Sequence, residues 1–484
     1  MDHPGWVGGT NFMLRVAVVG GGITGLATAY FLEQSVSDIA IDLFDADSRL
    51  GGKILTDTSQ NLVIEGGPDS FLAAKPAMVD LCEELGLAPR LIGVNPQAHG
   101  SYIFWQGQFY PIPEGMQTGV PARAKPLLTS PLLSPTGKLA LLRDLVARKS
   151  PAGDQSLGNF LRRRFGNQLV DRLAGPMLSG IYAGDIDRLS LKATFPHLLD
   201  AEQRAGSVYL GFRRSRPSAK NAPRRHRSAF LTLDHGLEEM VTVMADRLTH
   251  THVLLSTTVD RIAPAGKYWV VAAKGQDSVY DAVFVTTPAY ATANLLTFLP
   301  ADALDLLRRI PYASLAVIGA AYVPEDIRIP TNRTGFLVPS AAGLRMTAVT
   351  WVSSKWSYPD VLSLCVLRAF YGRAGENILG DSDEALLATF RKEIAATMRI
   401  HKPPQYLRIF RIPRAMPQYT VGHLERLERF HRFLAAYPRL FVLGAFEGGV
   451  GMPDRVLQAR QAVQAFCGQS AAGSADQQNS SANH

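Results

Sequence analysis

The most constraining feature of the chain is a glycine-rich turn between an apolar strand and a helix, close to its amino-terminal end. Residues 14–19 predict the strand and residues 23–34 the helix, with Gly20, Gly22 and Gly25 at and after the turn. At this spacing a dinucleotide-binding loop needs a tight turn, a close backbone approach to pyrophosphate and close helix packing. The sequence therefore predicts a doubly wound α/β domain that binds a dinucleotide.

The residues that follow this turn indicate a flavin dinucleotide rather than a nicotinamide one. Asp45 follows a second predicted strand, over residues 39–44, and stands twenty residues after Gly25, where a carboxylate can accept ribose hydroxyl protons. Arg49 offers a guanidinium to phosphate beside the Gly51-Gly52 turn, which suits the longer FAD molecule. We expect the amino end of the helix to face the phosphates.

A second glycine-rich turn lies near the other end of the chain. A buried strand is predicted over residues 440–443 and a helix over residues 453–466, with residues 444–452 between them. The amino end of such a helix would direct amide donors and partial positive charge at the pyrimidine edge of a flavin. That arrangement favours electron acceptance.

These motifs give one set of candidate cofactor-binding residues, and no metal-ligating set. The cofactor candidates are Gly20, Gly21, Gly22, Ile23, Thr24, Gly25, Asp45, Arg49, Gly52, Lys53, Gly66, Gly67, Pro68, Asp69, Val259, Gly444, Ala445, Val450, Gly451 and Met452.

Composition restricts the partners and the compartment. The net charge of +8 is concentrated in residues 212–227, which hold seven basic residues and no acidic one. We expect a solvated mobile loop there. Attraction of this loop to an anionic membrane or to a carboxylated substrate is left open. We expect no nucleic acid partner, because aromatic residues do not alternate with the basic ones. Three scattered cysteines and the lack of a long apolar run favour a cytoplasmic protein without a transmembrane helix.

The order of predicted elements divides the chain into interleaved domains. We expect an α/β fold, α+β overall, with a Rossmann-like FAD-binding domain, a mixed-sheet substrate-binding domain and a helical insertion domain. The expected boundaries are FAD-binding parts at 13–89, 231–288 and 436–467, a helical, membrane-facing insertion at 90–210, a basic loop at 211–230, a substrate-binding domain at 289–435 and a disordered tail at 468–484.

Four further motifs carry a family resemblance, which covers nearly the whole of residues 13–467. They are the segments 67–72, 154–158, 178–185 and 416–419, the last followed by Gly422 and His423. With them the chain resembles the oxygen-dependent protoporphyrinogen and coproporphyrinogen oxidases, within the amine-oxidase-like flavoproteins. We expect the 416–423 signature to fix a turn between domains, and His423 to be a structural hydrogen-bonding residue rather than a catalytic one.

The resemblance implies a reaction and its partners. In this family FAD removes six electrons from a porphyrinogen in three cycles, and O2 restores the flavin with release of hydrogen peroxide. No side chain of this sequence is a convincing general base, so we name no catalytic residue and leave the chemistry to flavin N5. The resemblance also leaves open a peripheral membrane contact, a ferrochelatase contact and the oligomeric state.

The resemblance places substrate-binding residues only in part. Lys75 is a candidate for a substrate propionate, and Gly180 and Ile181 are candidates for the wall of the substrate pocket. Ser101 stands where plant and animal protoporphyrinogen oxidases carry an arginine, which favours coproporphyrinogen III as substrate, with protoporphyrinogen IX as the alternative. An amine oxidase or polyene desaturase, and a flavin-free scaffold for haem enzymes, are the more distant alternatives.

Overall fold

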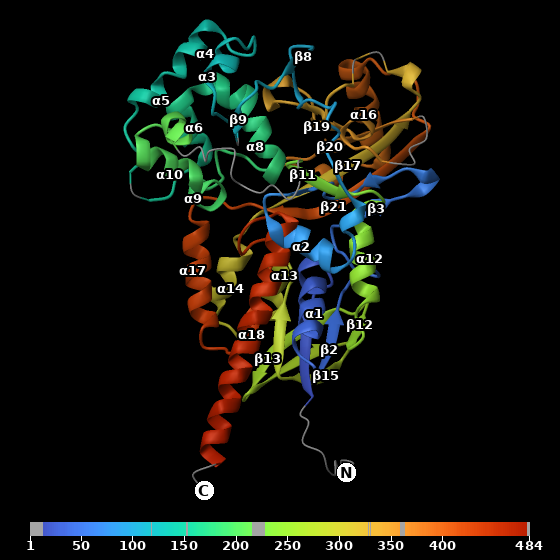
Figure 1. The fold of residues 1–484 in the computed structure, drawn as a ribbon, viewed down its shortest axis with the longest axis vertical. Coiled ribbons are helices and arrows are strands. Elements are labelled where there is room, and N and C mark those ends of the chain that lie inside the picture. The colour runs from blue at the N-terminus through green and yellow to red at the C-terminus, as the bar shows by residue number, and fades with distance from the viewer. Residues whose placement is uncertain are drawn as a thin grey trace.

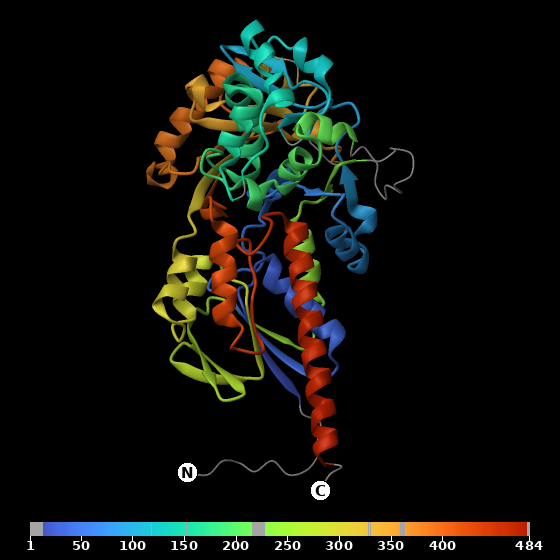
Figure 2. The same cartoon turned by 90° about the vertical axis from the view of Figure 1, so that its left-hand side faces the viewer.

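The structure is a computed structural model in which residues 13–117, 119–151, 153–214, 228–327, 329, 331–358 and 364–481 are described. A parallel sheet occupies one end of the molecule, and a larger sheet and a helical region lie side by side at the other (Figure 1). Figure 2 shows the same division from the side.

The parallel sheet has five strands drawn from three distant parts of the chain. In spatial order they are β12 (Thr251–Leu254), β2 (Ile39–Phe44), β1 (Leu14–Val19), β16 (Ala282–Val285) and β22 (Leu440–Val442). Every neighbouring pair is parallel. The order and direction of these strands are those of a doubly wound fold, so the predicted fold class is confirmed.

Both faces of this sheet are buried, as the apolar sequence of β1 requires. Val16 and Val18 face a core completed by α1 (Ile23–Ser35), α2 (Pro76–Glu84), α12 (Glu238–Asp246) and α18 (Met452–Ser481). Ala17 and Val19 face the opposite core, which includes α13 (Ala289–Leu295), α14 (Ala301–Arg308) and α17 (His423–Leu434). The antiparallel strands β13 (Val259–Ala265), β14 (Tyr268–Ala273) and β15 (Gln276–Tyr280) also cover that side.

The larger sheet has seven strands. They are, in spatial order, β21 (Tyr406–Pro417), β17 (Tyr312–Tyr322), β20 (Cys365–Tyr371), β19 (Met346–Trp351), β18 (Gly335–Leu337), β7 (Tyr102–Trp105) and β8 (Gln108–Pro111). Only the β18–β7 pair is parallel among them, so the sheet is mixed. Helix α16 (Asp383–Met398) buries Leu386, Phe390 and Ile394 against one face.

The helical region lies between β8 and β11 in the sequence. Its helices are α3 (Ala124–Leu128), α4 (Pro135–Ala140), α5 (Arg143–Val146), α6 (Leu157–Phe165), α7 (Asn167–Leu169), a π-helical turn (Val170–Ala174), α8 (Gly175–Tyr182), α9 (Leu191–Thr194), α10 (Pro196–Ala205) and α11 (Val208–Arg214). Helix α8 contacts β18 and β19, which joins this region to the larger sheet.

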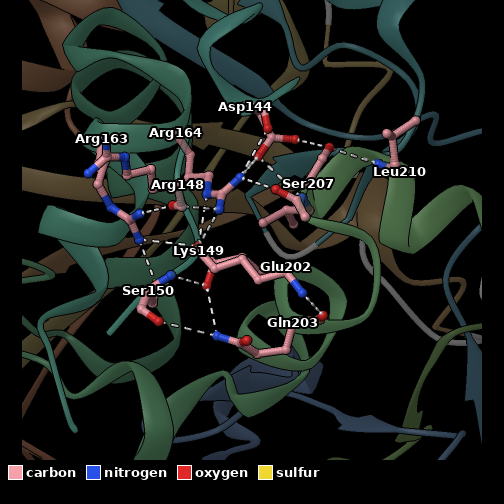
Figure 3. Close-up of polar contacts among 12 residues, drawn as sticks. Asp144, Arg148, Lys149, Ser150, Arg163, Arg164, Glu202, Gln203, Ser207 and Leu210 are labelled. Carbon is pink, nitrogen blue, oxygen red and sulfur yellow. Dashed lines mark hydrogen bonds and ion pairs between the residues drawn. The ribbon is translucent and has the colours of Figure 1, made fainter. Parts of the chain in front are cut away.

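A buried ion network holds four of these helices together (Figure 3). Arg164 of α6 is fully buried, and its guanidinium donates to Asp144 Oδ1 of α5 at 3.1 Å and to Glu202 Oε1 of α10 at 2.5 Å. Asp144 also accepts from the hydroxyl of Ser207 and from the first amides of α11. Because every charge in the network has a partner, burying it is tolerable.

The remaining strands and short helices connect these bodies. They are β3 (Thr56–Asp57), β4 (Ile64–Glu65), β5 (Phe71–Leu72), β6 (Leu91–Gly93), β9 (Met116–Gln117), β10 (Val120–Pro121), β11 (Phe230–Leu233) and α15 (Val352–Lys355). Among the described residues, none of the helices is both long and apolar enough to cross a lipid bilayer.

The structure corrects the predicted organisation at three points. Helix α18 continues to Ser481, so the disordered tail predicted over 468–484 is wrong for 468–481; a helix already formed through residue 466 extends at low cost because no new nucleus is needed. The predicted insertion over 90–210 begins with strands, because the β7–β8 hairpin pairs with β18 of the larger sheet. The basic loop predicted over 211–230 starts within α11 and ends within β11, and its residues 215–227 lie outside the described residues.

Candidate cofactor and substrate site

The first glycine turn lies at the carboxyl edge of the parallel sheet, between β1 and α1. A Cβ atom on Gly25 would lie 1.8 Å from the carbonyl oxygen of Gly20, so only glycine permits this approach of helix to strand. A Cβ atom on Gly22 would meet nothing within 4 Å. Gly22 is the N-cap of α1 and has no side chain to cap the helix, so the first amides of α1 face open space.

Asp45 holds this turn from the end of β2. Its Oδ2 accepts from the Gly21 amide at 2.6 Å, and its Oδ1 accepts from the Asp47 amide at 2.8 Å. Burial raises the pKa of Asp45 above its ordinary value, although these two backbone hydrogen bonds lower it. Each carboxylate oxygen keeps a free lone pair, so the ribose contact of Asp45 stays a prediction.

Arg49 lies at the predicted position, but its guanidinium binds the protein. It donates to the carbonyl oxygens of Leu50 at 3.0 Å, Gly52 at 2.5 Å and Ile54 at 2.9 Å. The neighbouring Gly51 amide donates to the carbonyl of Gly21 at 2.9 Å, which joins this loop to the first turn. Arg49 therefore fixes the second loop, and a direct phosphate contact stays a prediction.

Lys53 and the 66–69 segment form the next layer of the site. A Cβ atom on Gly67 would lie 1.9 Å from the carbonyl oxygen of Lys53, so the two loops touch there through backbone alone. The Lys53 ammonium donates to the carbonyls of Arg414 and Ala415 at 3.1 and 2.5 Å. Lys53 is solvent-accessible, yet surrounding protein lowers the pKa of its ammonium to about 8 through desolvation, which is typical of a residue that lines a recess.

Asp69 belongs to a buried charge cluster that sequence reasoning did not identify. It pairs with Lys355 of α15 at 2.7 Å and with Arg368 of β20 at 3.3 Å, and Arg368 also donates to the carbonyl of Gly67 at 2.6 Å. These cations hold the pKa of Asp69 well below its ordinary value, against its burial. The nearby Glu65 is buried, and desolvation raises its pKa to about 7.

The second glycine turn leads from β22 into α18. Gly444, Ala445, Val450, Gly451 and Met452 lie along it, and Val450 packs against the core of the helical region. Lys75 is the N-cap of α2, and its ammonium is bonded at 2.6 Å to each carboxylate oxygen of Asp454, in the first turn of α18. Its predicted role in substrate binding stays a prediction.

The remaining predicted site residues lie on β13 and on α8. Val259 begins β13 and is buried in the core on the far face of the parallel sheet. Gly180 and Ile181 are exposed near the end of α8, and a Cβ atom on Gly180 would meet nothing within 4 Å.

The 416–423 signature joins the end of α8 to the second glycine turn. The Gln418 amide donates to the carbonyl of Tyr182 at 2.8 Å, and the Tyr419 hydroxyl donates to the carbonyl of Ala445. His423 stacks on Tyr419, with ring centroids 4.3 Å apart, and its Nε2 lies 2.9 Å from the carbonyl oxygen of Phe446. The expectation of a structural histidine fixing an interdomain turn is consistent with these contacts.

Arg455 is a further residue of the site that no sequence motif singled out. Its guanidinium lies behind the second glycine turn and is bonded to carbonyls of that turn. Residue spacing in the sequence does not reveal contacts with distant segments or with loop backbone. The partners of Lys355, Arg368 and Arg455 are of these kinds, which is why the sequence did not identify these three residues. The one available signal for Arg455 was its position in the first turn of a predicted helix.

The donors at these loops fit an anionic dinucleotide. The uncapped amino end of α1 opens onto unfilled space at Gly22, as a pyrophosphate requires. Lys53 adds a positive charge whose bonds go to carbonyls rather than to a described carboxylate. The donors and the open space at Gly22 are therefore compatible with FAD, and the residue assignments stay predictions.

The fold and these loops define a flavin-dependent oxidoreductase, and the chain belongs to the flavin containing amine oxidoreductase family, which matches residues 23–466. It also belongs, more narrowly, with the coproporphyrinogen III oxidases. It is 35% identical to the coproporphyrinogen III oxidase of Bacillus subtilis (strain 168), over 93% of this chain and 97% of the relative. It is 33% identical to that of Staphylococcus aureus (strain NCTC 8325 / PS 47), over 93% and 98%.

A solved structure agrees with the sequence relatives. The crystal structure of a protein named "putative protoporphyrinogen oxidase", from Exiguobacterium sp. 255-15, superimposes with a TM-score of 0.83 at 33% identity. The superposition covers 94% of this chain and 98% of that one. The family resemblance expected from the sequence motifs is thus confirmed, and FAD is the cofactor of the family.

Proposed function

We propose that the protein catalyses the six-electron oxidation of coproporphyrinogen III to coproporphyrin III, with O2 as electron acceptor. The observation that carries the proposal is that the 416–423 signature joins the exposed end of α8 to the second glycine turn. The strand that leads into this signature also accepts a hydrogen bond from Lys53, whose loop is bonded to the first glycine turn through the Gly51 amide. Bound FAD supplies the two-electron acceptor, so three cycles consume three O2 and release three hydrogen peroxide. The names of the full-length relatives support the choice of substrate class.

The protein's own residues bind and orient in this proposal. The first amides of α1 and the ammonium of Lys53 hold the anionic part of the cofactor, and Asp45 and Arg49 keep their loops in shape. Gly180 offers backbone without a side chain at an exposed, unfilled position, where a flat macrocycle can approach closely. The substrate's pyrrole nitrogens release their own protons, so no side chain is required as a base.

The direct test follows porphyrin fluorescence under air from coproporphyrinogen III and protoporphyrinogen IX, side by side, with purified FAD-loaded protein. We expect a higher kcat/KM for coproporphyrinogen III, and loss of one O2 for each two electrons removed. Preference for protoporphyrinogen IX would support the alternative substrate, and oxidation of neither would refute the proposal.

Lys75→Ala tests the substrate contact separately. Because coproporphyrinogen III has more carboxylates to bind, we expect the variant to raise KM more for it than for protoporphyrinogen IX. The ion pair with Asp454 must open for this contact to form, so Asp454→Asn is the matched comparison and should leave Lys75 free. Equal losses for the two substrates in Lys75→Ala would remove Lys75 from the substrate site.

We also propose that helices α3 to α5 contact an anionic membrane surface. Leu139 of α4 is 67% exposed and Val146 of α5 is 83% exposed, with Leu128, Leu142 and Leu145 exposed beside them. The segment 123–149 carries six basic residues, and its single acidic residue, Asp144, is buried in the ion network. An apolar surface bordered by positive charge suits anionic lipid headgroups. These helices lie at the end of the molecule opposite the parallel sheet (Figure 1).

Co-sedimentation with vesicles tests this contact. We expect binding to phosphatidylglycerol vesicles and not to phosphatidylcholine vesicles, with loss of binding in the double variant Leu139→Ser, Val146→Ser. Val279→Ser, an exposed valine on β15 at the other end of the molecule, serves as the control and should bind as the wild type does. Binding that is unchanged in the double variant would exclude this surface.

A further inference from the structure

Arg455 is a buried arginine that bends back over the second glycine turn. Only 4% of its surface is exposed. One terminal nitrogen donates to the carbonyl of Gly444 and, at 2.9 Å, to Gln458 Oε1. The other donates to the carbonyls of Gly448 and, at 2.7 Å, Gly449. The guanidinium therefore fixes the shape of the turn through hydrogen bonds to the backbone carbonyls of the turn.

The charge of Arg455 has no carboxylate partner among the described residues. The nearest acidic residues along the chain are engaged elsewhere, since Asp454 pairs with Lys75 and Glu447 lies 2.7 Å from the His431 ring. Burial lowers the pKa of Arg455, and the carboxylates of Asp454 and Glu447 oppose that shift without forming an ion pair with it; an arginine stays protonated at neutral pH. Nε of Arg455 also lacks a hydrogen-bond partner.

Comparison with the other fully buried arginines shows that this arrangement is unusual for the protein. Arg164 pairs with Asp144 and Glu202, and Arg368 pairs with Asp69. A buried charge without a counter-charge is costly, and such groups are retained where an anion compensates them. Because Asp454 and Glu447 act on Arg455 without forming an ion pair, a further anion is expected on the ligand side of the turn.

A second uncompensated cation lies on the facing loop. The Lys53 ammonium is 5.9 Å from the ring centroid of Tyr312, and Arg455 interacts electrostatically with the same tyrosine. Both cations bond to backbone carbonyls, and they come from the two loops predicted to hold the cofactor. Positive charge thus comes from both of these loops.

We propose that Arg455 is a positioning residue whose charge, acting through the second glycine turn, stabilises negative charge on the bound flavin. The inference rests on the proposed flavin enzyme and deepens it. The amino end of α18 contributes partial positive charge at the same place, and Arg455 adds a full charge behind it. Because electron uptake makes the flavin ring more negative, the same charge favours the reduced cofactor.

Sulfite binding and the midpoint potential of the bound flavin test this without a porphyrinogen. Sulfite adds its electron pair to oxidised flavin at N5, and the displaced ring electron pair becomes negative charge at the pyrimidine end. The FAD-loaded proteins to compare are the wild type, Arg455→Gln and Arg455→Lys. Arg247→Gln is the control, because Arg247 also binds two backbone carbonyls, of Glu84 and Leu85, but away from the glycine turns.

The expected result separates charge from loop shape. Arg455→Gln should bind sulfite about tenfold more weakly and show a lower midpoint potential, as loss of a partly buried helix-end charge predicts. Arg455→Lys, which keeps the charge but not the fork of donors, should stay close to the wild type, as should Arg247→Gln. Unchanged sulfite affinity in Arg455→Gln, or an equal loss in Arg455→Lys, would overturn the proposal.

The comparison can also be made if Arg455→Gln loses the cofactor. Should Arg455→Gln hold no FAD, the dissociation constant of FAD from the refilled apoprotein is compared instead, and Arg455→Lys must again lie near the wild type. Failure of the wild type to bind FAD would refute the proposed function itself, which distinguishes that outcome from failure of the role of Arg455.

Discussion

Gly22 and Gly25 lie in the same turn but tolerate a side chain very differently. A Cβ atom on Gly25 would collide with the carbonyl of Gly20, whereas one on Gly22 would project into open space. Gly25 is therefore required by the fold, whereas a requirement for glycine at position 22 is predicted to come from the ligand. The spacing of glycines in the sequence predicts the motif but does not distinguish these two reasons.

Gly22→Asp should abolish FAD binding while leaving the apoprotein folded. The new carboxylate fits the protein sterically but lies where the pyrophosphate must approach, so repulsion should weaken FAD by more than about tenfold. FAD titration and thermal unfolding of the apoprotein measure the two effects. Gly25→Ala is the opposite case and should lower the melting temperature. Stoichiometric FAD in purified Gly22→Asp would contradict the placement of the cofactor.

His423 should make stability depend on pH below neutrality. Burial lowers the pKa of His423 to about 4, with Asp154 opposing and Arg426 adding to the shift. The unfolded chain, with an ordinary histidine pKa, binds the proton more readily, so stability is complete above about pH 6.5 and is lost as pH falls toward 4, by up to about 3 kcal/mol. Urea unfolding at pH 7 and pH 4 measures this change.

His423→Gln is the matched variant for this measurement. The glutamine amide keeps a donor for the carbonyl of Phe446 but does not titrate in this range. The carboxylates titrate equally in both proteins, so the wild type should lose about 3 kcal/mol more than the variant between pH 7 and pH 4. Parallel pH profiles would show that His423 is not the titrating group.

At the scale of helices, the ion network of Arg164 adds to the apolar core that α6, α10 and α11 share. Helices α5, α6, α10 and α11 are short, and their N-terminal amides and basic ends converge on Asp144 and Glu202 (Figure 3). Hydrogen bonds from Arg164 and the Ser150 amide hold the pKa of Glu202 below its ordinary value despite burial. The network thus substitutes for longer helices in fixing the region.

Arg164→Met should destabilise the protein strongly. Removing the cation leaves two buried carboxylates without their partner, which costs about 3–5 kcal/mol. Arg162→Met on the same helix is the control, because its partners Asp171 and Asp187 are partly exposed and such pairs contribute about 1 kcal/mol or less. Chemical unfolding of both variants compares the losses. Similar losses would show that the buried network is not the stabilising feature.

The elements that could be predicted are those with a complete local signal. The bounds of β1 and β2 agree with the sequence because their apolar residues and flanking residues lie within each segment. The Asp69 cluster could not be found in this way, because Arg368 and Gly67 are 301 residues apart.

For the whole molecule, the end of α18 is the part least needed by the fold. The helix packs against the parallel sheet through Val456, Ala459, Val463 and Phe466. Its last turns project beyond the body of the protein (Figure 2). A chain ending at residue 468 should therefore keep the melting temperature and FAD content of the full chain. A fall in either quantity would assign a stabilising role to residues 469–484.

The parallel sheet takes β22 from residues 440–442 and its first two strands from residues 14–44. During translation the amino-terminal strands must therefore wait for most of the chain to leave the ribosome before their neighbour β16 and the edge strand β22 are available. Such delayed, long-range pairing is slow and exposes strand edges to aggregation. A polypeptide terminated before residue 440 would lack β22 and the second glycine turn, so we predict that it would not retain FAD.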